Sequence, residues 1–319
     1  MMYALKLTPA IKDYIWGGNR LTTEFDYVSF LDRQAEAWVL SCHKDGENII
    51  ENGEFEGRTL QEIINEHPEY MGENGKNKDD FPILIKLIDA KDNLSVQVHP
   101  DEEYAQRVEG EHGKTEAWYI LDNDEGAELI FGFSEDITKE EFRQAIESNT
   151  LTDKVNRVKV KKGDLFFIEA GTLHAIGKGI LLAEVQQNSN TTYRVYDYGR
   201  LQNGKPRELH IEKAIEVTNC NKSEISSDSI SVTDSEHYTE TLLSSCDIFT
   251  FSRIDIKDEA TFTADKDSFV SLVCIDGNGV LEYGEETVTL YKGDSLFLPA
   301  GLGEYRLMGK ISVLETKIP

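Results

Sequence analysis

Short runs of alternating apolar and polar residues recur along most of this chain, and they constrain its fold more than any other feature. Four of them are LSVQVH at 94–99, RVKVKKGD at 157–164, ATFTADKDSFVSLVC at 260–274 and VLEYGEETVTLYKGD at 280–294. A period of two places successive side chains on opposite faces of a β-strand, and the Gly, Asn and Asp residues between the runs favour turns. The sequence therefore predicts an all-β protein built from sandwiches or small barrels.

Two segments carry helix-start signals instead. Thr59 and Glu62 have the spacing of a capping box ahead of an apolar LxxII pattern, and Pro68 closes that segment. Thr138 and Glu141 repeat the same device. We therefore expect a few surface helices around the sheets.

An internal repeat indicates two β units. KGDLFFIEAGTLHA at 162–175 resembles KGDSLFLPAGLGEY at 292–305 at a constant offset of 130 residues. His174 in the first copy is replaced by Glu304 in the second, which predicts one active and one structural copy. The polar, Ser/Thr-rich stretch 221–240 is the candidate boundary or an edge strand, so we expect domains at 1–225 and 226–319, the second without a metal site.

Composition excludes several classes of partner. The chain has 319 residues with 33 Lys plus Arg and 59 Asp plus Glu, a net charge of −26. Such an acidic chain is unsuited to nucleic acid or to an anionic membrane surface. We see no signal peptide and no apolar run of membrane-spanning length, and the four cysteines form no CxxC pair. The sequence predicts a cytoplasmic protein.

Three of the predicted strands carry side chains that suit a metal ion. In LSVQVHPD, Gln97 and His99 share one strand face, and in GKTEAWYIL, Lys114 and Glu116 do the same. His174 follows a glycine turn at the start of an apolar strand. Each pattern alone has an ordinary structural explanation: a half-exposed strand for the first two, a core histidine for the third.

Taken together, these residues favour a metal site. Gln97, His99, Glu116 and His174 supply one amide, two imidazoles and one carboxylate, a donor set that suits zinc, with iron, manganese or cobalt as alternatives. The set contains no thiolate and leaves room for water or substrate, which favours a catalytic site.

The ordered set of motifs resembles the type I mannose-6-phosphate isomerases, which are zinc enzymes of the cupin fold. The strongest matches are QVHPD, GKTE, the KGD segment that ends at His174, and QQNSNTTYRVYDYGR at 186–200. Others are IWGG at 15–18, AEAWVLSCH at 35–43, FPILIKLIDAKDNLS at 81–95 and RELHIEKA at 207–214. The resemblance runs in order to about residue 215 and is looser beyond it. It implies two cupin-like jelly-roll units.

The resemblance also assigns roles to single residues. It places the zinc ligands at Gln97, His99, Glu116 and His174, with Gln97 the least certain because some short members lack it. It places the functional arginine at Arg194 and a further active-site residue at Lys114.

One position departs from the family pattern. Many members have an aspartate where this chain has Asn190, and an amide does not accept a proton as a carboxylate does. We therefore leave the general base unassigned and note Glu184 as an upstream carboxylate.

The expected function is a metal-dependent interconversion of mannose 6-phosphate and fructose 6-phosphate through a cis-enediol, with one zinc ion as Lewis acid and template. The expected partner is a sugar phosphate, and the oligomeric state stays open. In an acidic chain, local cations must attract the phosphate, and Lys86 and Arg200 are further candidates unless they form ordinary surface pairs. Another metal-dependent cupin, such as an oxygenase or a different sugar-phosphate isomerase, and a non-catalytic sugar-binding cupin remain alternatives.

Overall fold

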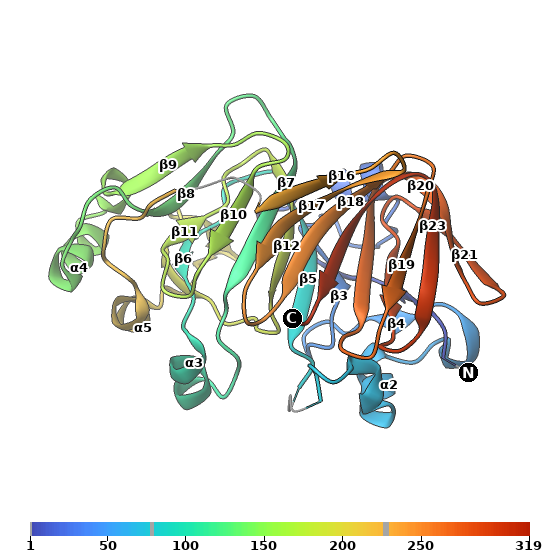
Figure 1. Ribbon diagram of the computed structural model, residues 1–319. Coiled ribbons are helices and arrows are strands. Elements are labelled where there is room, and N and C mark those ends of the chain that lie inside the picture. Colours follow the sequence, from blue (N-terminus) through green and yellow to red (C-terminus); the bar gives the residue numbers. More distant parts are fainter. Residues whose placement is uncertain (1, 77–79, 226–229) are drawn as a thin grey trace.

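Three large antiparallel sheets make up most of the computed structural model, which describes residues 2–76, 80–225 and 230–319 (Figure 1). The six-stranded sheet has the order β10 (Leu165–Ile168), β7 (Glu116–Asn123), β12 (Ile180–Gln187), β5 (Ile83–Ala90), β3 (Glu36–Leu40), β2 (Ala10–Lys12). The five-stranded sheet has the order β13 (Tyr193–Tyr196), β6 (Val96–Val98), β11 (His174–Ala175), β8 (Glu128–Phe133), β9 (Val155–Lys159).

The third sheet contains most of the C-terminal part of the chain. Its order is β16 (Ser231–Asp234), β17 (Tyr238–Ser245), β18 (Thr250–Ile256), β23 (Gly303–Lys317), β20 (Val270–Tyr283), β22 (Ser295–Leu298), β1 (Leu5–Thr8), β4 (Ile49–Ile50). β19 (Glu259–Ala264) pairs with β23, and β21 (Glu286–Tyr291) pairs with β20. A small ribbon joins β14 (Leu201–Gln202) and β15 (Lys205–Pro206). The all-β class predicted from the alternating runs is confirmed.

The predicted strand runs map onto shorter elements than the patterns alone indicate. The run at 157–164 is strand only to Lys159, because KKGD forms the following turn. The run at 260–274 covers β19 from Ala260 onward and β20 as far as Cys274, and the run at 280–294 contains the hairpin of β20 and β21. β16 is an edge strand inside the predicted boundary region. The boundary itself, at 225/226, adjoins residues 226–229, which lie outside the described residues, and it stays a prediction.

Both predicted capping boxes are present. Thr59 and Glu62 cap α2 (Leu60–Glu66), which ends before Pro68, and Thr138 and Glu141 cap α4 (Lys139–Glu147). Three further helices were not predicted from the sequence: α1 (Arg20–Phe25), α3 (Glu102–Val108) and α5 (Ile211–Val217). α1 and α5 have no side-chain cap, and the cap of α3 is Asp101. Short 3-10 turns occupy Gly53–Phe55, Pro68–Met71 and Leu151–Asp153. No helix within the described ranges has the length and apolar character needed to cross a membrane.

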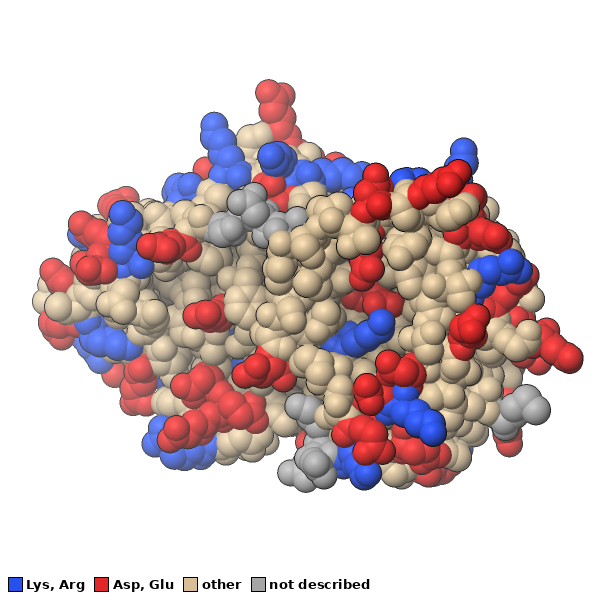
Figure 2. All heavy atoms as spheres, viewed as in Figure 1, with Lys and Arg blue, Asp and Glu red and all other residues tan. Residues whose placement is uncertain are grey.

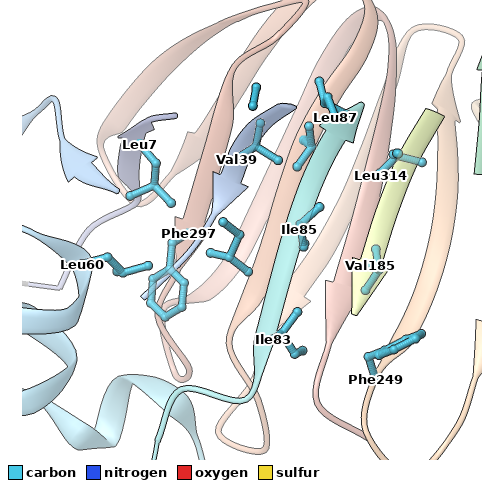
Figure 3. Close-up of a cluster of buried hydrophobic side chains, with 14 of the residues drawn as sticks. Leu7, Val39, Leu60, Ile83, Ile85, Leu87, Val185, Phe249, Phe297 and Leu314 are labelled. Atoms are coloured by element: carbon cyan, nitrogen blue, oxygen red, sulfur yellow. The ribbon is translucent and has the colours of Figure 1, made fainter. Parts of the chain in front are cut away.

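The six-stranded sheet is buried on both faces, which explains why β5 and β12 read as nearly continuous apolar runs. On one face, Ile85, Leu87 and Val185 pack against Phe297 and Leu314 of the ten-stranded sheet (Figure 3). On the other face, a second core joins it to the five-stranded sheet, and its members include Ile88, Trp118, Leu129, Phe131 and Leu182. The polar side chains that line this second space are therefore enclosed by two sheets.

The two copies of the KGD repeat share their turn geometry. In each copy the aspartate side chain accepts a hydrogen bond from the backbone N–H three residues earlier, at 2.9 Å for Asp164 and 2.8 Å for Asp294. Gly163 and Gly293 have φ values of +93° and +100°, a backbone conformation that favours glycine. The copies differ further on: His174 is fully buried, whereas Glu304 is exposed.

Candidate active site

Three buried side chains from separate segments converge between the six-stranded and five-stranded sheets. Nε2 of His99 and Nε2 of His174 are 3.1 Å apart. Oε2 of Glu116 lies 3.7 Å from Nε2 of His99, and Oε1 lies 3.5 Å from Nε2 of His174. The donor atoms of all three residues lie within 4.8 Å of one another, a spacing that can hold a metal ion. The structure thus brings together three of the four donors predicted from the sequence.

The strands explain this convergence. His99 directly follows β6, Glu116 begins β7, and His174 begins β11. β11 pairs with β6 so that His174 lies opposite Gln97, and β13 pairs on the other side so that Arg194 also lies opposite Gln97. One strand register therefore aligns a histidine, the amide and the arginine across neighbouring strands of the same sheet.

The hydrogen bonds of the two imidazoles prepare both rings to bind a cation. Nδ1 of His99 lies 2.9 Å from the carbonyl oxygen of Thr191, and Nδ1 of His174 lies 2.9 Å from that of Thr172. A carbonyl accepts only from N–H, so each ring carries its proton on Nδ1 and has a lone pair on Nε2. Burial lowers the pKa of His174 to about 4 and the pKa of His99 well below its usual range, with the nearby charge of Lys114 adding to both shifts.

Glu116 contributes a buried carboxylate whose hydrogen bonding is incomplete. It is fully buried, and burial followed by repulsion from Glu184 raises its pKa to about 7. Its Oε2 forms a 2.6 Å ion pair with Nζ of Lys114, but neither oxygen has a well-formed hydrogen bond among the described residues. Two neutral nitrogen lone pairs and an under-satisfied carboxylate fit a divalent cation, which would satisfy all three.

A pocket of about 270 Å³ opens beside these donors, and Gln97 and Lys114 both line it and contact the cluster. Its remaining lining residues are Tyr14, Trp16, Glu36, Lys86, Ile88, Leu94, Ser95, Ile176, Glu184, Asn190, Thr192, Arg194 and Arg207. Trp16 thus lines the pocket, whereas Trp38 is fully buried and is not among the lining residues. Acidic side chains are spread over the face of the molecule shown in Figure 2, with Lys and Arg side chains among them.

A row of residues across the six-stranded sheet carries buried charge. Trp118, Glu184 and Lys86 are register neighbours on β7, β12 and β5. Nε1 of Trp118 donates to Oε2 of Glu184 at 2.8 Å, and Nζ of Lys86 lies 3.1 Å from Oε1. Burial opposes the charge of Glu184, but Lys114 and Lys86 outweigh it and lower the pKa to about 2. Lys86 is 4% exposed, so a surface pair does not describe it.

Two arginines converge on one hydroxyl in the pocket. Nε of Arg194 and Nη2 of Arg207 donate to Oγ of Ser95 at 3.2 and 3.3 Å. Arg207 also pairs with Asp197 at 3.2 Å, whereas the second hydrogen bond of Arg194 goes to a neutral carbonyl oxygen. Arg200, the cation named from the sequence, pairs with Asp197 and does not line this pocket. Sequence reasoning missed Arg207, although RELHIEKA was among the matched motifs.

Gln97 lies next to the donors but presents its nitrogen. Its Nε2 is 3.4 Å from Nε2 of His174, and its Oε1 is 3.4 Å from Oγ of Ser95. An amide ligates a metal through oxygen, so coordination by Gln97 requires the amide to be turned by 180°. Its role as a ligand stays a prediction.

Comparisons with known proteins agree with this architecture. The family model described as phosphomannose isomerase type I, catalytic domain, matches residues 4–145, and the mannose-6-phosphate isomerase cupin domain model matches residues 238–317. The chain is 41% identical to mannose-6-phosphate isomerase ManA of Bacillus subtilis over 94% of both chains. It is 40% identical to mannose-6-phosphate isomerase of Streptococcus mutans, over 95% of this chain and 94% of that one.

Solved structures give the same result. The crystal structure of a mannose 6-phosphate isomerase from Bacillus subtilis superposes with a TM-score of 0.93 at 39% identity, covering 98% of this chain and 99% of that one. A zinc-bound mannose 6-phosphate isomerase that is 19% identical shares the fold, with a TM-score of 0.79 over 98% of both chains. The predicted cupin fold is confirmed.

Proposed function

The chain belongs to the type I phosphomannose isomerase family, and we propose that it interconverts mannose 6-phosphate and fructose 6-phosphate. The observation that carries this proposal is the convergence of His99, Glu116 and His174 beside a pocket lined by two arginines. Its substrate is a sugar phosphate, and the cytoplasm remains its predicted location.

We further propose that zinc is the metal. The two Nε2 lone pairs and the carboxylate of Glu116 would hold it, with Gln97 as a fourth ligand if its amide oxygen turns inward. Two imidazoles and one carboxylate are a donor set of catalytic zinc sites. A bound zinc ion supplies Lewis-acid stabilisation of negative charge on the substrate oxygens.

The reaction moves a proton between C2 and C1 of the sugar, so the pocket must hold a group that accepts and returns it. Glu184 is a buried carboxylate at the pocket wall, and Nζ of Lys114 lies 3.9 Å from its Oε1. We assign the proton transfer to Glu184 and give Lys114 the task of stabilising the neighbouring negative charge. Asn190 has no such capacity, because an amide does not accept a proton as a carboxylate does. Its nitrogen donates to Asp45 at 2.8 Å.

The arginine pair is the proposed phosphate site. A guanidinium forms charge-assisted, often bidentate hydrogen bonds with a phosphate, and the known contacts of Arg194 are neutral oxygens. The arginine pair separates the proposal from an oxygenase, which needs no phosphate-binding cations. A different sugar-phosphate isomerase would also need them, and against that alternative stands the membership of the family. A non-catalytic sugar-binding cupin needs no buried carboxylate such as Glu184 at the pocket wall.

Metal removal tests the central claim. Treatment with a chelator is expected to abolish isomerase activity, and stoichiometric Zn²⁺ is expected to restore it, because the bound metal supplies the Lewis-acid stabilisation of negative charge on the substrate oxygens. The measurement is a coupled assay of fructose 6-phosphate formation alongside metal analysis. Full activity in protein shown to be metal-free would contradict the proposal.

Arg194 provides a second test. Arg194→Ala is expected to lower kcat/KM by roughly 10²-fold, since a hydrogen bond to a charged group contributes about 1.5–3 kcal/mol. Arg194→Lys keeps the charge but not the planar donor pair, so its kcat/KM should lie between those of the wild type and Arg194→Ala. Wild-type kinetics for Arg194→Ala, with unchanged circular dichroism, would remove the arginine from the substrate site.

A further inference from the structure

The carbonyl that orients His99 belongs to a loop that other loops hold in place. His99 follows β6, but the oxygen that accepts its Nδ1–H is that of Thr191, which lies between β12 and β13. His174 differs, because its orienting carbonyl, Thr172, is two residues away on its own turn. The position of His99 therefore depends on how well the segment around Thr191 is fixed.

One support comes from the loop after β3. Nδ2 of Asn190 donates to Oδ2 of Asp45 at 2.8 Å. Asp45 is itself anchored: its backbone N–H donates to Nδ1 of His43 at 3.1 Å, and its carbonyl oxygen accepts a hydrogen bond from Lys12. The carboxylate thus connects a fixed loop to the residue next to Thr191.

A second support comes from the loop between α3 and β7. Oγ1 of Thr191 donates to Oε2 of Glu111 at 3.2 Å, and Nζ of Lys44 reaches Oε1 of the same carboxylate at 2.6 Å. Lys44, Asp45, Asn190, Thr191 and Glu111 therefore form a closed chain of contacts, which we call the clamp. It joins three loops, and one of its members, Asn190, also lines the pocket.

We propose that Asp45 is a positioning residue for the metal site, acting through Asn190 and the carbonyl of Thr191 on the orientation of His99. This inference rests on the proposed function, because it requires that His99 ligates a metal. Hydrogen-bond partners of metal-binding histidines typically change metal affinity by about 10–100-fold when removed. Exposed polar contacts such as those of Asp45 add little to global stability, so the effect should fall on the metal rather than on the fold.

The test compares zinc release from the full-length zinc-loaded protein and its variants, without substrate, using a chromogenic chelator. Asp45→Ala is expected to raise the zinc dissociation constant about tenfold, because Asn190 loses its acceptor. Asp45→Asn is expected to restore affinity to near the wild-type value, since the amide oxygen still accepts from Asn190. Asp234→Ala is the matched control, because this exposed carboxylate also accepts side-chain hydrogen bonds but lies on β16 in the ten-stranded sheet.

The possible outcomes distinguish a failure of the clamp proposal from a failure of the proposed function. If the wild-type protein binds no zinc, the proposed function fails. If the wild-type protein binds zinc and Asp45→Ala has the same zinc dissociation constant, the proposed function stands and the role of Asp45 is wrong. Equal weakening in Asp45→Ala and Asp45→Asn would also overturn the hydrogen-bond explanation, because only one of them loses the acceptor. Thermal unfolding of each variant verifies that the fold is intact.

Discussion

Replacing His174 by alanine is expected to lower isomerase turnover about 10³-fold and to remove tightly bound metal. Nε2 of His174 lies 3.1 Å from Nε2 of His99 and 3.5 Å from Glu116, so the substitution deletes one of three clustered donors. A metal ion contributes several kcal/mol of charge stabilisation in such reactions, and about 4 kcal/mol corresponds to a thousandfold in rate.

The experiment needs both a metal measurement and a control for folding. Zinc content per chain and kcat are measured for wild type, His174→Ala and His174→Gln, the last of which keeps more of the volume beside Trp118. His237→Ala is the control, because His237 is exposed and hydrogen-bonded to Asp258 in the C-terminal part of the chain. A His174→Ala protein that retains one zinc ion and wild-type kcat would refute the ligand assignment.

The features that local patterns specify were predictable. Alternation of apolar and polar residues gave the all-β class, and the capping boxes at Thr59 and Thr138 gave α2 and α4, because each signal lies within a few neighbouring residues. The shared strand face of Gln97 and His99 and that of Lys114 and Glu116 also follow from a period of two. These faces named His99 and Glu116, and the glycine turn named His174, the three donors that the structure brings together.

Features that depend on sheet packing were not predictable in the same way. From the sequence, Lys86 is either a cation that attracts the phosphate or one half of a surface ion pair. Because β5 lies in a sheet covered on both faces, its ammonium group is instead buried beside Glu184, at the wall of the pocket. Arg200 and Arg207 are seven residues apart around the β14–β15 ribbon, and only the later one turns into the pocket. Nothing in the local pattern separates two arginines in a polar loop.

The unusual amide at position 190 is explained by a contact that the sequence conceals. Asn190 donates to Asp45, which lies 145 residues earlier in the chain. An aspartate at position 190 would place two carboxylates within hydrogen-bond distance, and like charges that close cannot both be accommodated without a shift in pKa. The amide and the carboxylate at these two positions are therefore complementary.

Replacing Glu184 by glutamine is expected to lower kcat by about 10²–10⁴-fold, the contribution of a positioned general base. The glutamine is nearly isosteric, and its carbonyl oxygen still accepts the hydrogen bond from Nε1 of Trp118. It cannot take a proton from carbon, however, so the loss falls on the chemical step. KM should change much less, because the arginines proposed to bind the phosphate contact Ser95 rather than Glu184.

The same sheet offers a matched comparison. Glu36 accepts from Nε1 of Trp38 at 2.7 Å, as Glu184 accepts from Trp118, but it lies 3.9 Å from Lys86 and forms no ion pair with Lys114 within the described ranges. Glu36→Gln also leaves an amide beside a buried lysine and should reduce kcat by less than about tenfold. Because removing one partner of a buried ion pair costs about 3–5 kcal/mol, thermal unfolding is measured for both variants and kinetics are recorded well below each Tm. Equal losses of kcat in the two variants would show that Glu184 acts through buried charge balance, and the assignment of proton transfer to its carboxylate would then be wrong.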